Sequence, residues 1–304
     1  MIINKQNLLI SVILITFNGY TRGFLDQAID SVLSQTYKNF ELIIVDDGSI
    51  DETKNYCAKY INGSSVRYIY QTNKGPGAAR NNGIKNSKGG YICFIDDDDV
   101  WLQEKLQKQV NFFKNNQNKN IMILFTNLEL IDAFGKIVGT INYQNDNDIY
   151  KKLFFENIAG APSSVMIRKD VFDKVGFFKE DLKAAEDYDL WIRITRYFNR
   201  YVLDENLVKH RVHKKNTSLK IIFRYSLIAL LFAIEQDNRI NRDTVLNNFY
   251  KNFASNYYFD NNFNEFRKNL KIACVYGQIS INLKLKYYLS FFPYLIKLLR
   301  LFKK

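Results

Sequence analysis

The stretch GYICFIDDDDVW, residues 90–101, places an apolar run directly before four consecutive aspartates. The run YICFI (91–95) has the length and the aromatic and β-branched content of a buried strand. Four adjacent carboxylates repel one another, so their position at the end of such a strand indicates a cation that gathers there. The stretch therefore predicts a buried strand with a cation site at its carboxyl end.

Three more apolar runs precede this stretch and have the same character. They cover residues 8–16, 40–45 and 66–70, and segments with helical periodicity separate them. Strands that alternate with helices predict an α/β fold with a Rossmann-like, mostly parallel sheet flanked by helices. Parallel strands end at one edge of a sheet, where open α/β folds bind ligands. We therefore expect the polar loops after these strands to share one site.

Local signals refine this outline. Ser49 and Glu52 have the spacing of a capping box, which predicts a helix that begins near Ile50. Pro76 suits the first turn of the helix that follows the third strand. The pattern downstream predicts a strand at 121–126, a hairpin around Phe134 and Gly135, a strand at 163–168 and a helix at 186–198.

Composition and charge suggest two regions. The 304 residues are 47% hydrophobic and 15% aromatic, which is typical of a folded protein. The formal net charge is +12, and residues 219–304 carry 14 Lys/Arg against 5 Asp/Glu. We predict a sheet domain over residues 1–218 and a helical, basic and aromatic region over residues 219–304.

The basic C-terminal region favours an anionic partner, such as nucleic acid or the phosphates of a membrane leaflet. A merely solvated basic surface explains any single lysine equally well. The segment from Pro293 onward predicts an interfacial helix that contacts an anionic membrane, and a terminal helix packed on the domain is the alternative.

The cysteines indicate a reducing compartment. Cys57, Cys93 and Cys274 are isolated and show neither pairing nor zinc-ligand spacing, so we expect buried or inert thiols in a cytoplasmic protein. The basic C-terminal region makes the inner face of the cell membrane a candidate surface for this protein. The apolar run at 8–16 follows Lys5, as in a signal peptide, but it is about half of the ~20 residues that a membrane span needs. We predict a buried first strand there.

From Ser11 to about Ser218 the chain resembles the family 2 glycosyltransferases, which depend on nucleotide sugars and have the GT-A fold. The resemblance rests on six motifs in order: SVILITFNG, VDDGSIDET, QTNKGPGAARNNG, FIDDDDVW, EDYDLW and HKKNTS. It implies an inverting enzyme that moves one sugar from a nucleotide diphosphate-sugar, with a UDP-sugar as the first choice. From the basic, aromatic C-terminal region we expect the acceptor to be a hydroxyl of a lipid-linked or oligosaccharide molecule in bacterial surface polysaccharide synthesis, such as O-antigen or capsule, with no nucleic acid partner. The glutamine-arginine-tryptophan motif of processive synthases is absent, which favours transfer of a single sugar.

The resemblance assigns roles to the acidic run. Asp98 would bind a divalent magnesium or manganese ion on the donor diphosphate, and His213 would join the metal or the diphosphate. Asp96 or Asp97 would reach the ribose. Physically, Mg²⁺ takes one or two carboxylates together with substrate phosphates. The alternative for this run is a solvated acidic turn that caps the next helix.

The resemblance also assigns residues to the nucleotide. Asp46 and Asp47, with Asp47 preferred, would accept the N3 proton of a uracil or thymine base. Thr16 and Asn18 would flank the base and the ribose. The alternative for the two aspartates is ordinary turn chemistry.

Three further residues complete the predicted site. Gly75 and Arg80 would lie near the nucleotide, although a salt bridge from Arg80 to the aspartates is compatible with that position. Asp187 would be the general base that removes the proton of the acceptor hydroxyl. Adjacent helical residues point in different directions, so Glu186 cannot also face the acceptor. The alternative for Asp187 is a helix-start residue without a catalytic role.

Two other classes of protein fit parts of the pattern. A sugar-phosphate nucleotidyltransferase also has metal-binding aspartates on a Rossmann-like sheet, but it should carry a glycine-rich basic loop directly after the first strand, and SVILITFNGY lacks one. A non-catalytic protein that binds anionic membranes or nucleic acid is the second alternative, and it rests on the basic C-terminal region alone.

Overall fold

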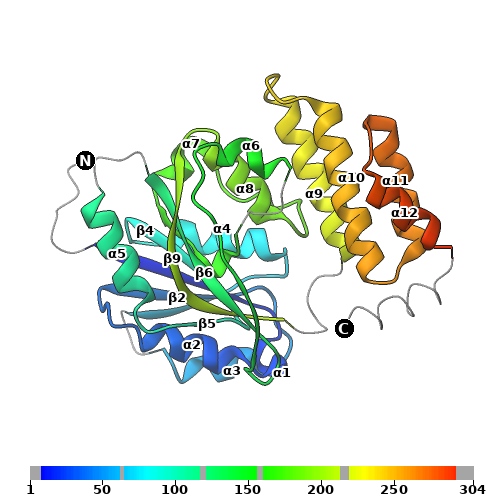
Figure 1. Cartoon of the computed structure of the whole chain (residues 1–304). Coiled ribbons are helices and arrows are strands. Elements are labelled where there is room, and N and C mark those ends of the chain that lie inside the picture. Colours follow the sequence, from blue (N-terminus) through cyan, green and yellow to red (C-terminus); the bar gives the residue numbers. More distant parts are fainter. Residues whose placement is uncertain (1–7, 62–64, 117–120, 156–159, 213–218, 292–304) are drawn as a thin grey trace. The chain divides into compact units, whose positions relative to one another are not determined.

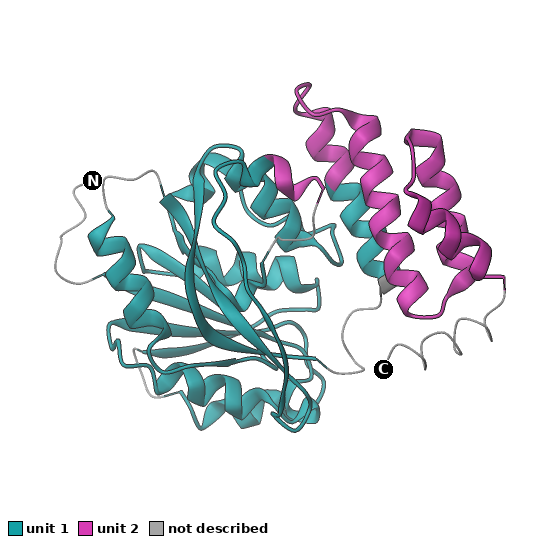
Figure 2. Cartoon of the chain, viewed as in Figure 1, with its two compact units in different colours: residues 1–150, 158–229 teal, residues 151–157, 230–304 magenta. Residues whose placement is uncertain are grey.

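The computed structural model describes residues 8–61, 65–116, 121–155, 160–212 and 219–291. The chain divides into two compact units, residues 1–150 with 158–229 and residues 151–157 with 230–304 (Figure 2). The predicted boundary between residues 218 and 219 precedes helix α9 (Leu219–Glu235), and the division by contacts falls inside that helix, after Ala229.

Unit 1 holds the sheet (Figure 1). The strands are β1 (Ile10–Thr16), β2 (Phe40–Asp46), β3 (Val66–Tyr70), β4 (Tyr91–Asp96), β5 (Val100–Trp101), β6 (Ile121–Ile131), β7 (Ile137–Ile141), β8 (Met166–Arg168) and β9 (Asn199–Arg211). The helices that accompany them are α1 (Gly19–Arg22), α2 (Leu25–Leu33), α3 (Thr53–Ala58), α4 (Pro76–Asn86), α5 (Lys105–Asn115), the 3₁₀ helix η1 (Pro162–Ser164), α7 (Val171–Val175) and α8 (Glu186–Thr195). Helix α6 (Ile149–Leu153) spans the division between the units.

In the described residues the nine strands form one sheet in the order β3-β2-β1-β4-β8-β6-β9-β5, with β7 beside β6. Strands β3, β2, β1 and β4 run parallel, whereas β8 is antiparallel to both β4 and β6. The predicted GT-A type of α/β fold, with a C-terminal helical extension, is confirmed. Thr16 pairs with Asp46, and Ile15 with Asp96, so the ends of three strands lie side by side at one edge.

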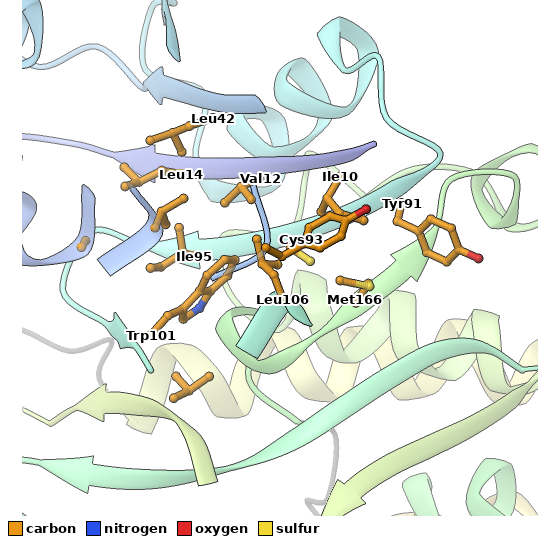
Figure 3. Close-up of a cluster of buried hydrophobic side chains, with 14 of the residues drawn as sticks. Ile10, Val12, Leu14, Leu42, Tyr91, Cys93, Ile95, Trp101, Leu106 and Met166 are labelled. Carbon is orange, nitrogen blue, oxygen red and sulfur yellow. The ribbon is translucent and has the colours of Figure 1, made fainter. Parts of the chain in front are cut away.

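Helices cover both faces of the sheet. Successive side chains of a strand point to opposite faces, so the apolar strand β1 places apolar side chains on both. Ile10, Val12 and Leu14 of β1 face a buried cluster that α2, α3 and α5 complete (Figure 3). Ile13 faces the other side, where α4 lies so close that a Cβ on Gly83 would come within 2.4 Å of the Ile13 side chain. A glycine is therefore required at this crossing, which seats α4 directly on the sheet.

Buried hydrogen bonds fix the segment that follows the aspartates. Trp101 Nε1 donates to the Ser163 carbonyl at 2.8 Å, and Gln109 Nε2 donates to the Ser164 carbonyl at 3.1 Å. The Ser163 hydroxyl in turn accepts the backbone N–H of Asp96 at 3.1 Å. Helix η1 thus ties the residues after the acidic run to its first residue.

Several predicted elements are confirmed and others differ. Strand β3 has the predicted bounds, and Pro76 is the first residue of α4. The capping-box prediction is wrong: α3 begins at Thr53 without a side-chain cap, because the Ser49 hydroxyl accepts the Asn18 N–H at 2.7 Å instead. The predicted helix at 186–198 ends at Thr195. Strand β9 was not predicted from the sequence, because the polar residues 204–206 interrupt its alternation of apolar and polar side chains.

Unit 2 is helical and contains α10 (Arg242–Phe259), α11 (Phe263–Tyr276) and α12 (Ile281–Leu289), together with the end of α9. Phe249 and Phe266 are among the side chains buried in this unit, and Asn247 Nδ2 of α10 donates to the Ala273 carbonyl of α11 at 2.7 Å. Among the helices that the structure describes, none combines the length and the hydropathy needed to cross a bilayer. The predicted interfacial helix from Pro293 lies outside the described residues.

Candidate active site

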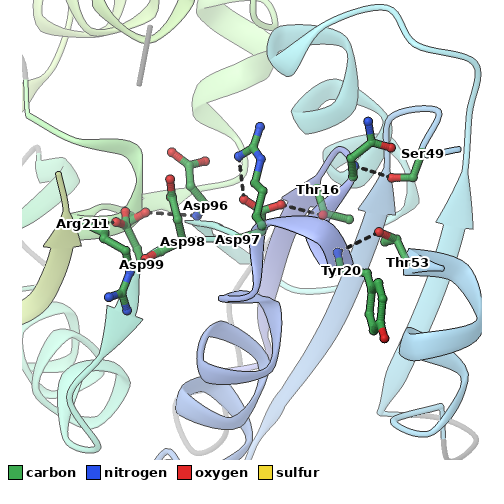
Figure 4. Close-up of polar contacts among 12 residues, drawn as sticks. Thr16, Tyr20, Ser49, Thr53, Asp96, Asp97, Asp98, Asp99 and Arg211 are labelled. Atoms are coloured by element: carbon green, nitrogen blue, oxygen red, sulfur yellow. Dashed lines mark hydrogen bonds and ion pairs between the residues drawn. The ribbon is translucent and has the colours of Figure 1, made fainter. Parts of the chain in front are cut away.

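The carboxylates of the acidic run diverge toward different partners (Figure 4). Asp97 is buried, accepts the Thr16 hydroxyl at 2.6 Å and forms an ion pair with Arg22 of α1 at 3.0 Å. Burial outweighs these two contacts and raises the pKa of Asp97 to about 7. Asp97 therefore joins the acidic run to the end of β1 and to α1.

Asp99 turns the other way, toward the end of β9. Its buried carboxylate accepts the Arg211 backbone N–H at 3.0 Å and lies 3.0 Å from Nδ1 of His210. Burial lowers the pKa of His210, but the charge and hydrogen bond of Asp99, together with the charges of Asp96 and Asp98, outweigh burial and raise the pKa to about 9. The resemblance selected His213, which lies outside the described residues, whereas His210 was not predicted to belong to the site.

Asp98 is half-buried at the tip of the turn, and its backbone carbonyl accepts Arg211 Nε at 2.9 Å. In the residues that the structure describes, no group of three or more His, Cys, Asp or Glu side chains is arranged to hold a metal ion. An Mg²⁺ or Mn²⁺ ion that binds with a nucleotide needs only one or two protein carboxylates, since phosphate oxygens supply further ligands. The carboxylate oxygens of Asp98 are suitable ligands for Mg²⁺ or Mn²⁺. Asp98 would supply only part of the coordination shell of such an ion.

Arg80 of α4 connects the acidic run to the start of α8. Arg80 is 3% exposed, and its guanidinium pairs with Asp96 at 2.7 Å and also with Glu186. The salt bridge from Arg80 to an aspartate of the acidic run, which is compatible with a position near the nucleotide, is thus present. Through this one cation, Asp96 and the segment that carries Asp187 meet at the edge of the sheet.

Asp187 lies in the first turn of α8, after Ala185 in a left-handed conformation (φ 57°). Its Oδ1 accepts the Tyr188 backbone N–H at 2.7 Å. Burial and the neighbouring Glu186 carboxylate raise the pKa of Asp187 to about 7, against the opposing effect of Arg80. A carboxylate with a pKa near neutrality is suited to general base catalysis at physiological pH.

Asp189, two residues further along α8, has a different environment. It forms ion pairs with Arg193 at 2.6 Å and with Lys179 at 2.9 Å. Together with the pairing of Glu186 to Arg80, these contacts leave Asp187 as the acidic residue of the EDYD stretch that is not held by a salt bridge in the described residues.

The loop after β2 is organised by Asp46 and Asn18. Asp46 accepts the Tyr68 hydroxyl and the Ser49 N–H, the latter at 2.8 Å. Asn18, in a left-handed conformation (φ 52°), donates its N–H to the Ser49 hydroxyl, and its Oδ1 accepts the Ile50 N–H at 3.0 Å. Figure 4 draws the hydrogen bond to the Ser49 hydroxyl as a dashed line. The loops after β1 and β2 therefore hold each other in place.

Asp47 fixes the loop between β3 and α4. It accepts the N–H groups of Lys74 at 2.9 Å and Gly75 at 2.8 Å, and the Gln71 side chain at 2.7 Å. Gly75 has φ 97°, which favours glycine. The backbone N–H of Asp47 donates to the Thr16 carbonyl at 2.8 Å, so this loop is joined to the end of β1.

The described residues among those predicted for the site lie in one connected network of contacts. The described members are Thr16, Asn18, Asp46, Asp47, Gly75, Arg80, Asp96, Asp97, Asp98 and Asp187. Sequence reasoning missed Arg22, His210 and Arg211. The available signal for Arg211 was its place beside the last motif, in HRVHKKNTS, whereas nothing in the sequence pairs Arg22 with Asp97.

Comparison with solved structures defines the class of fold. The chain is similar to a crystal structure of S. aureus TarS in complex with UDP-GlcNAc, with a TM-score of 0.64 and 19% identity, over 93% of this chain and 79% of that one. At this identity the likeness concerns the fold, and it agrees with the GT-A architecture of unit 1.

Sequence comparison then gives the family. Residues 11–176 match the family model described as Glycosyl transferase family 2. An uncharacterized glycosyltransferase of Rickettsia prowazekii is 36% identical over 226 residues, which cover 70% of this chain and 68% of the relative. One from Methanocaldococcus jannaschii is 30% identical over 224 residues, 72% of this chain and 76% of that protein. The chain belongs to glycosyltransferase family 2.

Proposed function

We propose that this chain is an inverting, metal-dependent glycosyltransferase that moves one sugar from a UDP-sugar to a hydroxyl of a lipid-linked or oligosaccharide acceptor in bacterial surface polysaccharide synthesis. The structural neighbour TarS was solved with UDP-GlcNAc, which makes UDP-sugars the first donors to test. The basic region after residue 219 supports an acceptor carried on an anionic membrane.

The observation that carries the proposal is the meeting of two acidic segments through Arg80. This guanidinium contacts Asp96, in the acidic run, and Glu186, which directly precedes Asp187. A transferase needs its base and its leaving-group site on the two sides of one sugar carbon. The Arg80 bridge supports that arrangement, because it holds the start of α8 beside the tip of β4.

In the proposed reaction, Asp187 removes the proton of the acceptor hydroxyl. The hydroxyl oxygen forms a bond to the anomeric carbon from the face opposite the diphosphate, and the bond from that carbon to the diphosphate oxygen breaks with its electrons leaving on the diphosphate. A divalent ion held by Asp98 would neutralise the charge that develops on the leaving group. A base in the correct place contributes roughly 10² to 10⁴ in rate.

The donor nucleotide would occupy the loops at the ends of β1 and β2. Asp47 is proposed to read the base, and Asp46 lies beside it with its oxygens engaged by Tyr68 and Ser49. Thr16 and Asn18 would flank the base and the ribose. Both aspartates also hold loop backbone, so substitution at either one should affect loop order as well as donor affinity.

The rate of sugar transfer should depend on the ionisation of Asp187. The base must be unprotonated, and burial raises its pKa to about 7. Below that pH, kcat/KM is expected to fall about tenfold per pH unit, since the free enzyme then holds a proton on its base. A kcat/KM profile measured from pH 5 to 9 with a saturating divalent ion tests this, and a flat profile would contradict the assignment.

The proposed function itself is tested by a panel of UDP-, GDP- and dTDP-sugars with manganese, in which both nucleotide release and thermal stability are measured. We expect one donor class to be cleaved and to raise the melting temperature, because a ligand that binds only the folded state stabilises it. Stabilisation without any nucleotide release, with a range of sugar acceptors supplied, would favour a binding protein. Absence of both effects for all donors would overturn the proposal.

A further inference from the structure

Arg211, the last residue of β9, lies buried beside the acidic run and has no part in the reaction described above. Arg211 is 1% exposed, although its side chain carries a charge. Nε donates to the Asp98 carbonyl at 2.9 Å, Nη1 to the Asp132 carbonyl in the β6–β7 turn at 3.0 Å, and Nη2 to Gln27 Oε1 of α2 at 2.8 Å. The Phe24 ring lies 4.3 Å from the guanidinium carbon. One side chain therefore joins the acidic run to a helix and a hairpin.

Asp99 makes the reverse contact to the same residue. Its Oδ1 accepts the Arg211 backbone N–H at 3.0 Å, while the Arg211 side chain donates to the carbonyl of Asp98. We call these two opposed hydrogen bonds, between Asp98–Asp99 and Arg211, the reciprocal clamp; Figure 4 labels its three residues. The Asp99 N–H also donates to the Asp96 carbonyl at 3.1 Å, which closes the turn. The main chain at Asp98 is thus held in place by the hydrogen bond to the Asp98 carbonyl and by the hydrogen bonds of Asp99.

We propose that Arg211 is a positioning residue: the reciprocal clamp fixes the Asp98 peptide so that its carboxylate is oriented for the metal ion of the donor diphosphate before that ion binds. The proposal rests on the proposed function. Contacts that orient a ligating side chain commonly change metal affinity by about 10- to 100-fold when they are removed. An arginine suits this task because its planar fork reaches several acceptors in fixed directions, which a lysine ammonium cannot do.

The test compares two conservative substitutions of buried arginines in β9 of the full chain. Arg211→Lys keeps the positive charge and loses the fork. Arg200→Lys is the matched control, because Arg200 is also buried and donates to a backbone carbonyl, that of Gln144 at 2.9 Å, outside the acidic run. The readout is the dissociation constant of Mn²⁺ in the presence of saturating UDP, measured from the electron paramagnetic resonance signal of free Mn²⁺, with the melting temperature recorded for each variant.

We expect Arg211→Lys to raise the Mn²⁺ dissociation constant by about 10- to 100-fold and Arg200→Lys to leave it at the wild-type value. Wild-type Mn²⁺ affinity in Arg211→Lys, or an equal loss in both variants, would show that Arg211 serves stability alone and would overturn the proposal. If Arg211→Lys does not fold, Gln27→Ala decides, since it removes one acceptor of the guanidinium, and an unchanged dissociation constant there overturns the proposal. A wild-type chain that binds no Mn²⁺ with UDP would instead contradict the proposed function, and the clamp's role with it.

Discussion

Asp187→Asn is expected to lower the rate of sugar transfer by about 10² to 10⁴ while donor affinity stays close to that of the wild type. The amide cannot take the proton of the acceptor hydroxyl. It keeps the shape of the side chain and the carbonyl oxygen that accepts the Tyr188 N–H at 2.7 Å. Single-turnover transfer and calorimetric titration with UDP measure the two quantities separately.

The same variant is expected to be more stable than the wild type at pH 8. The pKa of Asp187 rises from the usual 3.8 to about 7 on folding, chiefly because of burial. Between these values the folded chain holds a proton that the unfolded chain has lost, so the free energy of unfolding decreases as the pH rises through this window. Asparagine has no such titration. Thermal unfolding at pH 4 and pH 8 measures the difference, and a variant that is less stable at pH 8 would contradict the pKa assignment.

Asp189→Asn is the control on the same helix. Asp189 is held by Arg193 and Lys179, so its substitution should lower the melting temperature and leave most of the transfer rate. If Asp187→Asn transfers sugar at the wild-type rate, or if Asp189→Asn shows the larger loss, then Asp187 is not the base.

Asp98→Ala should have the second large effect. It removes the carboxylate proposed to hold the metal ion, which supplies several kcal/mol of charge stabilisation in enzymes of this kind, so transfer should fall on the order of 10² to 10³. Mn²⁺ should no longer increase the affinity of the variant for UDP. The variant should then bind UDP as weakly as the wild type does when a chelator removes the metal. Titration of both proteins with UDP, with and without Mn²⁺, measures this.

Asp170→Ala controls for the loss of one negative charge. Asp170 lies at the start of α7, is half exposed and pairs with Arg168. Its substitution should leave the metal dependence of UDP binding unchanged. If UDP binding depends on the metal equally in Asp98→Ala and in the wild type, Asp98 is not the metal ligand. That result would favour the alternative that the acidic run is a solvated turn.

Strands β1, β2 and β4 of the parallel half of the sheet were predictable because they are buried along nearly their whole length. The run YICFI is apolar without interruption, FELIIV is apolar except for Glu41, and β4 and β2 follow these two runs closely. Strand β9 has polar residues in its centre, and its place between β6 and β5 is decided by partners far away in the sequence. The local sequence pattern therefore predicts strands that are buried and apolar, and it misses a strand such as β9 whose position depends on pairing with distant strands.

The candidate site shows the same division. The acidic run and the EDYD stretch were recognisable as motifs, and their meeting at the sheet edge followed from the expected topology. The choice of cation for each carboxylate did not follow: Asp97 pairs with Arg22, and Asp96 shares Arg80 with Glu186. These pairings depend on how closely α4 approaches the sheet and on how α1 turns after β1. The spacing of residues in the sequence determines neither the approach of α4 to the sheet nor the direction of α1.

The proposed function requires that Asp98 and Asp187 act on one nucleotide sugar from two sides. A crystal structure of the full chain with UDP and Mn²⁺, with data collected at the manganese absorption edge, tests it most directly. We expect an anomalous peak within about 2.5 Å of an Asp98 carboxylate oxygen, in contact with the UDP phosphates, with Asp187 facing the open side of the terminal phosphate. A peak held by other residues, or UDP bound away from the end of β4, would contradict it.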